Sequence, residues 1–239
     1  LQDAVSLLRG ETGSPIKITI FRKNFKAPKE FTIVRDIIKV RSVVHKLYQE
    51  DIGYIKLRNF SKNTSSDLDK ALDDLEQKGI TKLILDVRNN PGGLLNQAVE
   101  VTDRFLNREN LIVYTKGRSN EQNMRFTSHD KVAGVNYPLI VLVNSGSASA
   151  SEIVAGALQD LNRAIVLGTP TFGKGSVQTI IPLSDGSALK LTTARYYTPS
   201  GRVIQENGIE PDILVEMEPV EEIEKKDKDE ESEEKTKLR

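Results

Sequence analysis

Apolar residues follow two different spacings along this chain, and the order of these spacings predicts alternating strands and helices. Short runs rich in Leu, Ile and Val predict strands, at residues 54–57, 82–87, 139–143 and 163–167. Apolar residues three and four positions apart predict helices, at residues 65–78 and 150–161. Alternating strands and helices are typical of an α/β fold, in which functional residues gather at the carboxyl ends of the strands. We therefore predict an α/β domain in the middle of the chain.

The two ends of the chain differ from this middle part. Near the start, the pattern predicts a helix at residues 3–9 and a hairpin of two strands at residues 16–21 and 30–34. From residue 216 onward, acidic and basic residues are mixed, which predicts a disordered segment or a solvated helix. The sequence begins at Leu1 without a visible signal peptide, so we expect further residues to precede it. The predicted parts are residues 1–40, 41–215 and 216–239.

Composition argues against several classes of function. The chain has 239 residues, a formal net charge of +0 and no cysteine. The balanced charge, without a basic and aromatic patch, argues against nucleic-acid binding. The lack of cysteine removes thiol nucleophiles, disulfides and cysteine-bound zinc. No apolar run reaches the roughly 18 residues that a membrane span needs, and we expect neither a metal nor a cofactor.

Serine is the nucleophile that remains. Neither His45 nor His129 lies near a serine in a recognisable nucleophile motif, and the G-x-S-x-G and H-E-x-x-H motifs are absent. A serine with a lysine base is the remaining variant of the acyl-transfer site. The candidate segments are Gly-Ser-Ala-Ser-Ala-Ser-Glu at residues 146–152 and Phe-Gly-Lys-Gly-Ser-Val-Gln at residues 172–178.

Ser149 stands at the amino end of the helix that is predicted to begin at Ala150. At that end, free backbone N–H groups and the positive end of the helix dipole favour negative charge, such as that of an oxyanion. A purely structural role is also open, because Ser149 and Glu152 fit the S-x-x-E capping box.

Lys174 lies between two glycines and before a predicted strand. Residues 168–174 also fit G-x-x-x-x-G-K, but Gly175 stands where a nucleotide-binding loop needs a hydroxyl, and such a loop opens a helix. To accept a proton from a serine, the lysine amine must be neutral, whereas a free lysine is almost wholly charged at pH 7. We therefore expect dry surroundings for Lys174, supplied by Phe172, Val177 and the packed serine helix.

Three segments of the chain resemble the signature segments of the carboxy-terminal processing peptidases, also called tail-specific proteases. The first is Asp-Val-Arg-Asn-Asn-Pro-Gly-Gly at residues 86–93, and the others are residues 146–153 and 171–178. The resemblance covers roughly residues 51–212 and keeps the order of the segments.

The resemblance implies a role for each matching position. Ser149 corresponds to the nucleophile, Lys174 to the general base, and Gln178 to the residue that hydrogen-bonds and orients the lysine. The backbone N–H groups of Gly93 and Ala150 correspond to the oxyanion hole. For Asp86 and Arg88 a direct catalytic role is open, but we favour a structural one, in which Asp86 satisfies turn N–H groups and Arg88 braces the loop.

The resemblance also implies a fold, a location and partners. It implies a crotonase-like α/β core of the ClpP/crotonase type at residues 41–215, preceded at residues 1–40 by the carboxy-terminal part of a PDZ domain; from pattern alone a small hairpin subdomain is equally open. It implies an extracytoplasmic protein of the bacterial periplasm, cell envelope or secreted fraction, with the thylakoid lumen less favoured. The implied partners are protein or peptide substrates with accessible carboxy-terminal tails, further copies of the chain in a homo-oligomer, and a regulatory protein.

Two functions from different classes follow. The first is a serine endopeptidase that cleaves protein substrates near their carboxyl termini through a Ser149 acyl-enzyme. The second is a catalytically silent or latent scaffold that uses the same fold to bind peptides. The intact set of Ser149, Lys174 and Gln178 favours the first.

Overall fold

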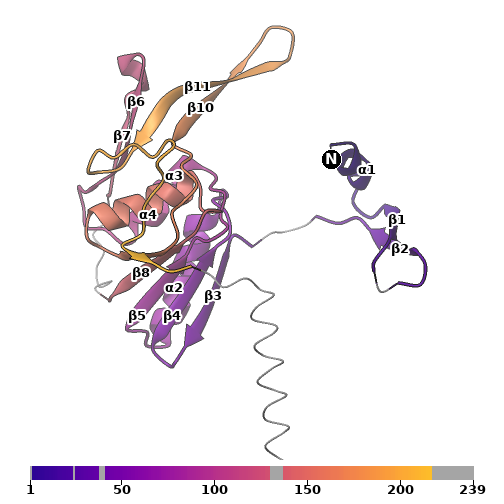
Figure 1. Cartoon of the computed structure of the whole chain (residues 1–239), viewed down its shortest axis with the longest axis horizontal. Helices are drawn as coiled ribbons and strands as arrows, with labels where there is room; N and C mark the ends of the chain where they lie inside the picture. The colour runs from indigo at the N-terminus through magenta and orange to yellow at the C-terminus, as the bar shows by residue number, and fades with distance from the viewer. Residues whose placement is uncertain (1, 24, 38–40, 130–136, 217–239) are drawn as a thin grey trace, which may run out of the picture. The chain divides into compact units, whose positions relative to one another are not determined.

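The computed structural model describes residues 2–23, 25–37, 41–129 and 137–216 (Figure 1). The chain divides into two compact units, Leu1–Arg41 and Ser42–Arg239, each of which is considered by itself. The predicted tail of residues 216–239 lies outside the described residues from residue 217 onward, so its structure stays a prediction.

In the described residues of the first unit, one helix is followed by one hairpin. Helix α1 spans Gln2–Leu8, and strands β1 (Pro15–Ile20) and β2 (Lys29–Val34) pair antiparallel. The Arg35 guanidinium joins the two parts, because it donates to the carbonyl oxygens of Leu8 (2.9 Å) and Leu7 (3.1 Å) at the end of the helix. The predicted order of helix, strand and strand is confirmed, whereas the assignment to a PDZ domain stays a prediction.

The second unit is built on a six-stranded sheet with the order β12-β9-β8-β5-β4-β3. All neighbours pair parallel except β3, which pairs antiparallel with β4 at one edge. The strands are β3 (Val43–Tyr48), β4 (Ile52–Leu57), β5 (Lys82–Asp86), β8 (Leu139–Val143), β9 (Ile165–Gly168) and β12 (Ile213–Leu214). The predicted α/β class is therefore confirmed. The two edge strands, β12 and β3, were not predicted.

Three helices complete the core of this unit. They are α2 (Thr64–Gln77), α3 (Leu95–Asp103) and α4 (Ala150–Asp160), and α3 contacts both of the others. Helix α4 carries apolar residues on nearly all of its sides, and accordingly it is buried from Ala150 to Leu158. Each fully buried leucine, such as Leu68 or Leu158, stabilises the fold by about 1.5–3 kcal/mol relative to an exposed one.

A second, antiparallel sheet has the order β10-β11-β6-β7. Its strands are β6 (Leu111–Gly117), β7 (Arg125–Thr127), β10 (Ser176–Pro182) and β11 (Ala188–Tyr197), with a short 3₁₀ helix, η1, at Asn120–Gln122. Figure 1 shows the β10–β11 hairpin extending away from the helices, and its outer residues are exposed, including Ile180 at 68% and Leu191 at 46%. Strand β10 begins two residues after Lys174, so one strand of this sheet is directly connected to the candidate site.

Candidate active site

Ser149 lies between β8 and α4 in a strained backbone conformation. Its φ is 56° and its ψ is −110°, outside the common left-handed region as well as the right-handed ones. A non-glycine residue in such a region costs about 1–3 kcal/mol, and such strain gathers at functional sites. The side chain is partly exposed at the amino end of the buried helix.

The serines on either side of Ser149 are fully buried and hydrogen-bonded. The Ser147 hydroxyl donates to the Val87 carbonyl oxygen at 2.7 Å and accepts from the Asn144 N–H at 3.1 Å. The Ser151 hydroxyl donates to the Asn90 carbonyl oxygen at 2.9 Å. Both hydroxyls hold the serine loop against the segment that follows β5, so Ser149 is the serine of this run with an accessible hydroxyl.

Two glycines bring the segment after β5 into contact with the serine loop. Gly92 has φ +96°, and a Cβ there would lie 2.6 Å from the Ala148 carbonyl oxygen and 2.9 Å from the Ala150 nitrogen. Gly93 has φ +152°, and a Cβ there would lie 2.2 Å from the Phe60 carbonyl oxygen. No side chain fits at either position, because both the backbone angle and the space exclude it.

The two predicted oxyanion-hole donors are free in this arrangement. Within the described residues, neither the Gly93 N–H nor the Ala150 N–H donates a hydrogen bond to a protein acceptor. The neighbouring N–H groups are engaged: Gly92 donates to Asn90 Oδ1 at 2.9 Å and Ser149 donates to Glu152 Oε2 at 2.6 Å. Free backbone donors beside a serine can stabilise negative charge on an attacked carbonyl oxygen.

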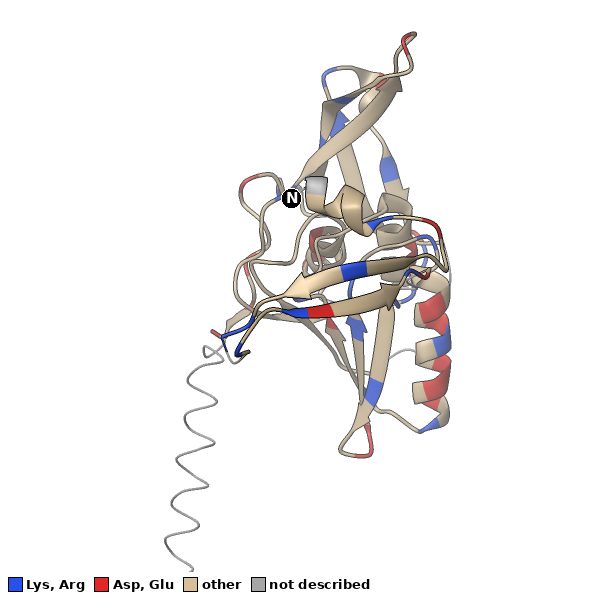
Figure 2. Cartoon of the chain, turned by 90° about the vertical axis from the view of Figure 1, so that its right-hand side faces the viewer, with Lys and Arg blue, Asp and Glu red and all other residues tan. Residues whose placement is uncertain are grey.

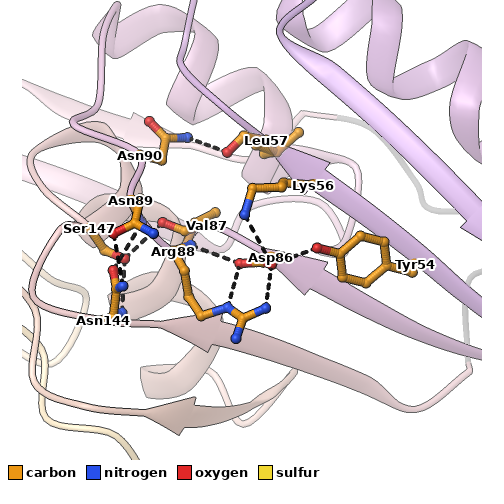
Figure 3. A network of polar contacts seen from close by, with 10 residues as sticks. All are labelled: Tyr54, Lys56, Leu57, Asp86, Val87, Arg88, Asn89, Asn90, Asn144 and Ser147. Carbon is orange, nitrogen blue, oxygen red and sulfur yellow. Dashed lines mark hydrogen bonds and ion pairs between the residues drawn. The ribbon is translucent and has the colours of Figure 1, made fainter. Parts of the chain in front are cut away.

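Asp86 anchors the start of this segment in a buried polar network (Figure 3). Its Oδ1 accepts from the Arg88 backbone N–H at 2.8 Å and from Arg88 Nε at 3.0 Å, while Oδ2 accepts from Arg88 Nη2 at 2.7 Å and the Tyr54 hydroxyl at 2.6 Å. Lys56 Nζ lies 3.4 Å from Oδ2. The predicted structural role of Asp86 and Arg88 is confirmed by these contacts.

The same network shifts the pKa values of its members. Burial raises the pKa of the Asp86 carboxyl, but the hydrogen bonds from Arg88 and Tyr54 outweigh burial and hold the pKa below its ordinary value. Burial and the hydrogen bond to Asp86 raise the pKa of Tyr54 to about 12. Asp86 is therefore an acceptor-only carboxylate across the neutral pH range.

Asparagines connect the segment after β5 to its neighbours. Asn90 Nδ2 donates to the Leu57 carbonyl oxygen at 2.9 Å, and the Asn90 carbonyl oxygen accepts from the Ala148 N–H at 3.0 Å. Asn144 Oδ1 accepts from the Asn89 N–H at 2.9 Å, and its Nδ2 donates to Asn89 Oδ1 at 3.0 Å (Figure 3). These bonds fix the glycine pair relative to Ser149.

Glu152 joins the serine helix to the segment that carries Lys174. Its buried carboxylate accepts from the N–H groups of Ser149 (2.6 Å), Gly173 (2.6 Å) and Lys174 (2.9 Å) and from the Thr171 hydroxyl (2.7 Å). The Ser149 and Lys174 nitrogens share the same oxygen, Oε2, so the two backbones are adjacent. The contact between Glu152 and the Ser149 N–H is the one that the capping box predicts; the other three were not predicted.

The Lys174 side chain is exposed, as is Gln178 on β10. Phe172, expected to shield the lysine, is 67% exposed. Within the described part of the chain, no hydrogen bond joins Lys174 Nζ to the Ser149 hydroxyl or to Gln178. The expectation of dry surroundings for Lys174 is therefore wrong for this structure: the packed part of the segment is its backbone, buried at Gly173 and Gly175, and the side chain is left in solvent.

A hollow of about 400 Å³ lies at the carboxyl ends of β8 and β9. Its lining includes Arg88, Asn144 and Ser145 but not Ser149, so it lies beside the candidate nucleophile and not over it. Among the residues that the structure describes, no three His, Asp or Glu side chains are grouped to hold a metal ion. His45 Nε2 lies 2.8 Å from Asp74 Oδ2. This contact gives His45 a structural role and requires no catalytic one.

Comparison with known proteins identifies the family. The model of peptidase family S41 matches residues 51–215, which include every candidate site residue. The chain belongs to peptidase family S41. The predicted resemblance to the carboxy-terminal processing peptidases is thereby confirmed.

Relatives in the S41 family extend over most of this chain. A carboxy-terminal-processing protease of Bartonella bacilliformis is 54% identical over 91% of the chain and 50% of the relative. A carboxyl-terminal-processing protease of Synechocystis is 41% identical over 91% of the chain and 51% of the relative. The chain thus spans about half the length of these relatives.

Solved structures show the same S41 fold. The photosystem II D1 C-terminal processing protease superposes with a TM-score of 0.69 at 32% identity, covering 90% of this chain and 58% of that one. An S41 protease of Bacteroides fragilis, 18% identical, superposes with a TM-score of 0.63 over 90% of this chain and 62% of that one, and this shows likeness of fold alone. The predicted α/β protease core is confirmed.

Proposed function

We propose that this chain is the peptidase part of a serine protease that cleaves polypeptides near their carboxyl termini. The observation that carries the proposal is the meeting of a strained, partly exposed Ser149 with the free N–H groups of Gly93 and Ala150. The names of the S41 relatives, which are carboxy-terminal processing proteases, support the kind of substrate.

In the proposed mechanism, the Ser149 hydroxyl attacks a peptide carbonyl carbon while Lys174 Nζ accepts the hydroxyl proton. The carbonyl oxygen becomes an oxyanion, which accepts hydrogen bonds from the Gly93 and Ala150 N–H groups. A single donor of this kind contributes about 3 kcal/mol to the stability of the transition state. The tetrahedral intermediate collapses to an acyl-enzyme, and the leaving amine takes the proton from Lys174. Water, deprotonated by Lys174, then hydrolyses the ester.

The exposure of Lys174 sets a condition for this mechanism. The amine must be neutral to accept a proton, and water around an exposed amine favours its charged form. We propose that a bound polypeptide covers Lys174 and excludes that water, and that the side-chain carbonyl of Gln178 then accepts a hydrogen bond from the amine. The site would thus be completed by its substrate.

Location and partners are part of the same proposal. We infer an extracytoplasmic enzyme that acts on protein or peptide tails, assembles as a homo-oligomer and is controlled by a regulatory protein. No helix in the described ranges is long and apolar enough to cross a membrane.

Mass spectrometry of a peptide with an apolar tail, incubated with this chain, tests the proposed function. We expect cleavage near the carboxyl end, and no cleavage by the Ser149→Ala variant, which lacks only the hydroxyl. Cleavage of equal rate by that variant would refute Ser149 as the nucleophile.

The exposed Lys174, without a bond to Ser149, gives a specific reason to keep a second candidate, the catalytically silent or latent peptide-binding scaffold. On that alternative, the Ser149→Ala variant and the unchanged chain bind the peptide equally and both leave it intact.

A further inference from the structure

An exposed cationic face lies on the four-stranded sheet, on the side away from the core. Strand β11 pairs with β6 so that Arg195 stands directly opposite Lys116. Both side chains are exposed, while Ala194 and Thr115, the preceding residues of the two strands, are 5% and 1% exposed. Arg118 follows the end of β6, and it extends the row of positive charge.

The pairing of Lys116 with Arg195 is unfavourable unless something compensates it. Like charges directly opposite each other on antiparallel strands destabilise a sheet. Within the described residues, no carboxylate forms an ion pair with Lys116, Arg118 or Arg195. The carboxylates of residues 111–129 and 176–197 are Glu121, in the 3₁₀ helix η1, and Asp185, in the turn between β10 and β11. Figure 2 shows Lys and Arg along these strands with acidic residues at their ends.

The cations surround a surface hollow of about 500 Å³. Its lining includes Lys116, Arg118, Gln122 and Arg195.

Tyr114 and Tyr197 stack beside this hollow with their ring centroids 5.1 Å apart, and Lys116 Nζ lies 5.5 and 5.2 Å from the two centroids. The ring faces attract the ammonium group without supplying a carboxylate acceptor. The N–H groups of Lys116 and the two guanidinium groups thus stay available to an anionic ligand.

This face is close to the candidate active site along the sheet. Arg195 pairs with Ser176, which is two residues after Lys174. With a strand rise of about 3.3 Å per residue and a strand separation of about 4.8 Å, Arg195 and Lys174 lie on the order of 10 Å apart along the backbone. An extended polypeptide covers that distance in about three residues.

We propose that this cationic face binds acidic side chains of the polypeptide substrate, within a few residues of the bond that is cut. The inference rests on the proposed peptidase function and adds a preference for Asp and Glu to it. Lys116 and Arg118 are two residues apart, a spacing that matches carboxylates at alternate positions of an extended chain. A single terminal carboxylate would engage only one part of such a row, so the face fits acidic side chains better than a chain end.

The test compares peptides that differ only in charge. Each pair of peptides carries two Glu or two Gln residues at alternate positions on one side of the scissile bond, and both ends are blocked. We expect the Glu peptide to be cleaved with a kcat/KM about tenfold higher at low salt, about threefold for each of two cations engaged. Salt at 0.5 M should reduce the ratio, because these charges are exposed.

Variants assign the preference to this face. In the Lys116→Gln/Arg118→Gln/Arg195→Gln triple variant the ratio should fall to near one, whereas Lys190→Gln, on the same strand but outside the hollow, should keep it. The melting temperature should change little, because the replacements remove the like-charge contact of Lys116 with Arg195 together with the favourable contacts of Lys116 with the two tyrosine rings. A lower melting temperature with an unchanged ratio would show a structural role and overturn the inference.

A binding measurement separates this inference from the proposed function. Fluorescence anisotropy of the same labelled peptides with the Ser149→Ala variant should show the preference for Glu even if no peptide is cleaved. Equal binding and equal cleavage of the Glu and Gln peptides would overturn the inference and leave the peptidase function intact. If neither blocked peptide binds but a Gln peptide with a free carboxyl end does, the proposed occupant would be wrong, because the face would then recognise a chain terminus.

Discussion

At the scale of single residues, the backbone strain of Ser149 links stability to activity. Glycine adopts a positive φ readily, whereas a positive φ is unfavourable for any residue with a Cβ. We expect Ser149→Gly to be more stable than Ser149→Ala by about 1–2 kcal/mol, although both lack the hydroxyl and both should be inactive. Thermal unfolding of the two variants checks this. Equal melting temperatures would mean that the surrounding contacts impose no strain on this residue.

Ser147 provides the opposite case. Its hydroxyl is buried and engaged with both Val87 and Asn144. Ser147→Ala should lose about 1–3 kcal/mol of unfolding free energy, because it leaves buried polar groups unpaired. It should nevertheless retain much of the peptidase activity, since Ser147 takes no chemical part. If Ser147→Ala proved as inactive as Ser149→Ala while staying folded, the choice of nucleophile would be wrong.

The Asp86 network predicts a pH dependence of stability. The pKa of Asp86 is lower in the folded protein than its ordinary value of about 3.9, so the ionised carboxylate contributes stability above that pH. This contribution is lost as the pH falls through the folded-state pKa. We expect Asp86→Asn to lower stability at neutral pH by about 3 kcal/mol, because it removes the buried carboxylate that Arg88, Tyr54 and Lys56 contact. The variant should also flatten the acid limb of a plot of melting temperature against pH.

Asp73→Asn, exposed on α2, is the matched control for this measurement. It should change neither the neutral melting temperature nor its acid dependence. An acid limb that is the same in Asp86→Asn and in the unchanged chain would show that other carboxylates govern acid unfolding.

At the scale of elements, Glu152 couples helix α4 to the lysine segment. All four contacts of its carboxylate are with donors, so Glu152→Gln places an NH₂ group against an N–H or a hydroxyl. We expect a loss of about 2–4 kcal/mol in stability and a fall of at least tenfold in kcat/KM, since the Lys174 backbone loses its anchor. Glu210→Gln, on an exposed loop, should change neither quantity. Full activity of a folded Glu152→Gln variant would show that another contact positions Lys174.

The elements also show what could be predicted from the sequence. Helix α4 and strand β8 were predicted within a residue or two, because each has a clear apolar period and ends at a turn. Strands β3 and β12 were not predicted. Strand β3 lies at an edge and has one buried residue, Val43, while β12 has only two residues, so neither has the apolar pattern of a buried strand.

The site was predictable in its residue types and less so in its geometry. The hydrogen-bond partners of the Glu152 carboxylate and of the Asn90 carbonyl oxygen lie up to 61 residues away in sequence, and no local pattern encodes such contacts. The exposure of Lys174 was not predicted either, because apolar neighbours in sequence, such as Phe172, do not necessarily pack on the lysine side chain.

At the scale of the whole molecule, the chain spans about half of its S41 relatives, and the PDZ assignment of residues 1–40 makes a prediction about tail recognition. If these residues are part of a PDZ domain, the rest of that domain would capture carboxyl-terminal peptides by strand addition. We expect a protein that carries the complete PDZ domain to cleave a peptide with a free apolar carboxyl tail faster than its amidated form. The chain of residues 1–239 should show little such difference. Equal ratios of kcat/KM in both proteins would place tail recognition in the peptidase unit.

The central claim, that Ser149 and Lys174 act as one catalytic unit, is tested most directly by a double-mutant cycle. The measurement is kcat/KM for one peptide with the unchanged chain, Ser149→Ala, Lys174→Ala and the variant with both changes. We predict that each single change lowers kcat/KM by several orders of magnitude and that the double variant is hardly worse, because a nucleophile without its base and a base without its nucleophile fail in the same step. Losses that add, or a Lys174→Ala variant of nearly full activity, would contradict the account.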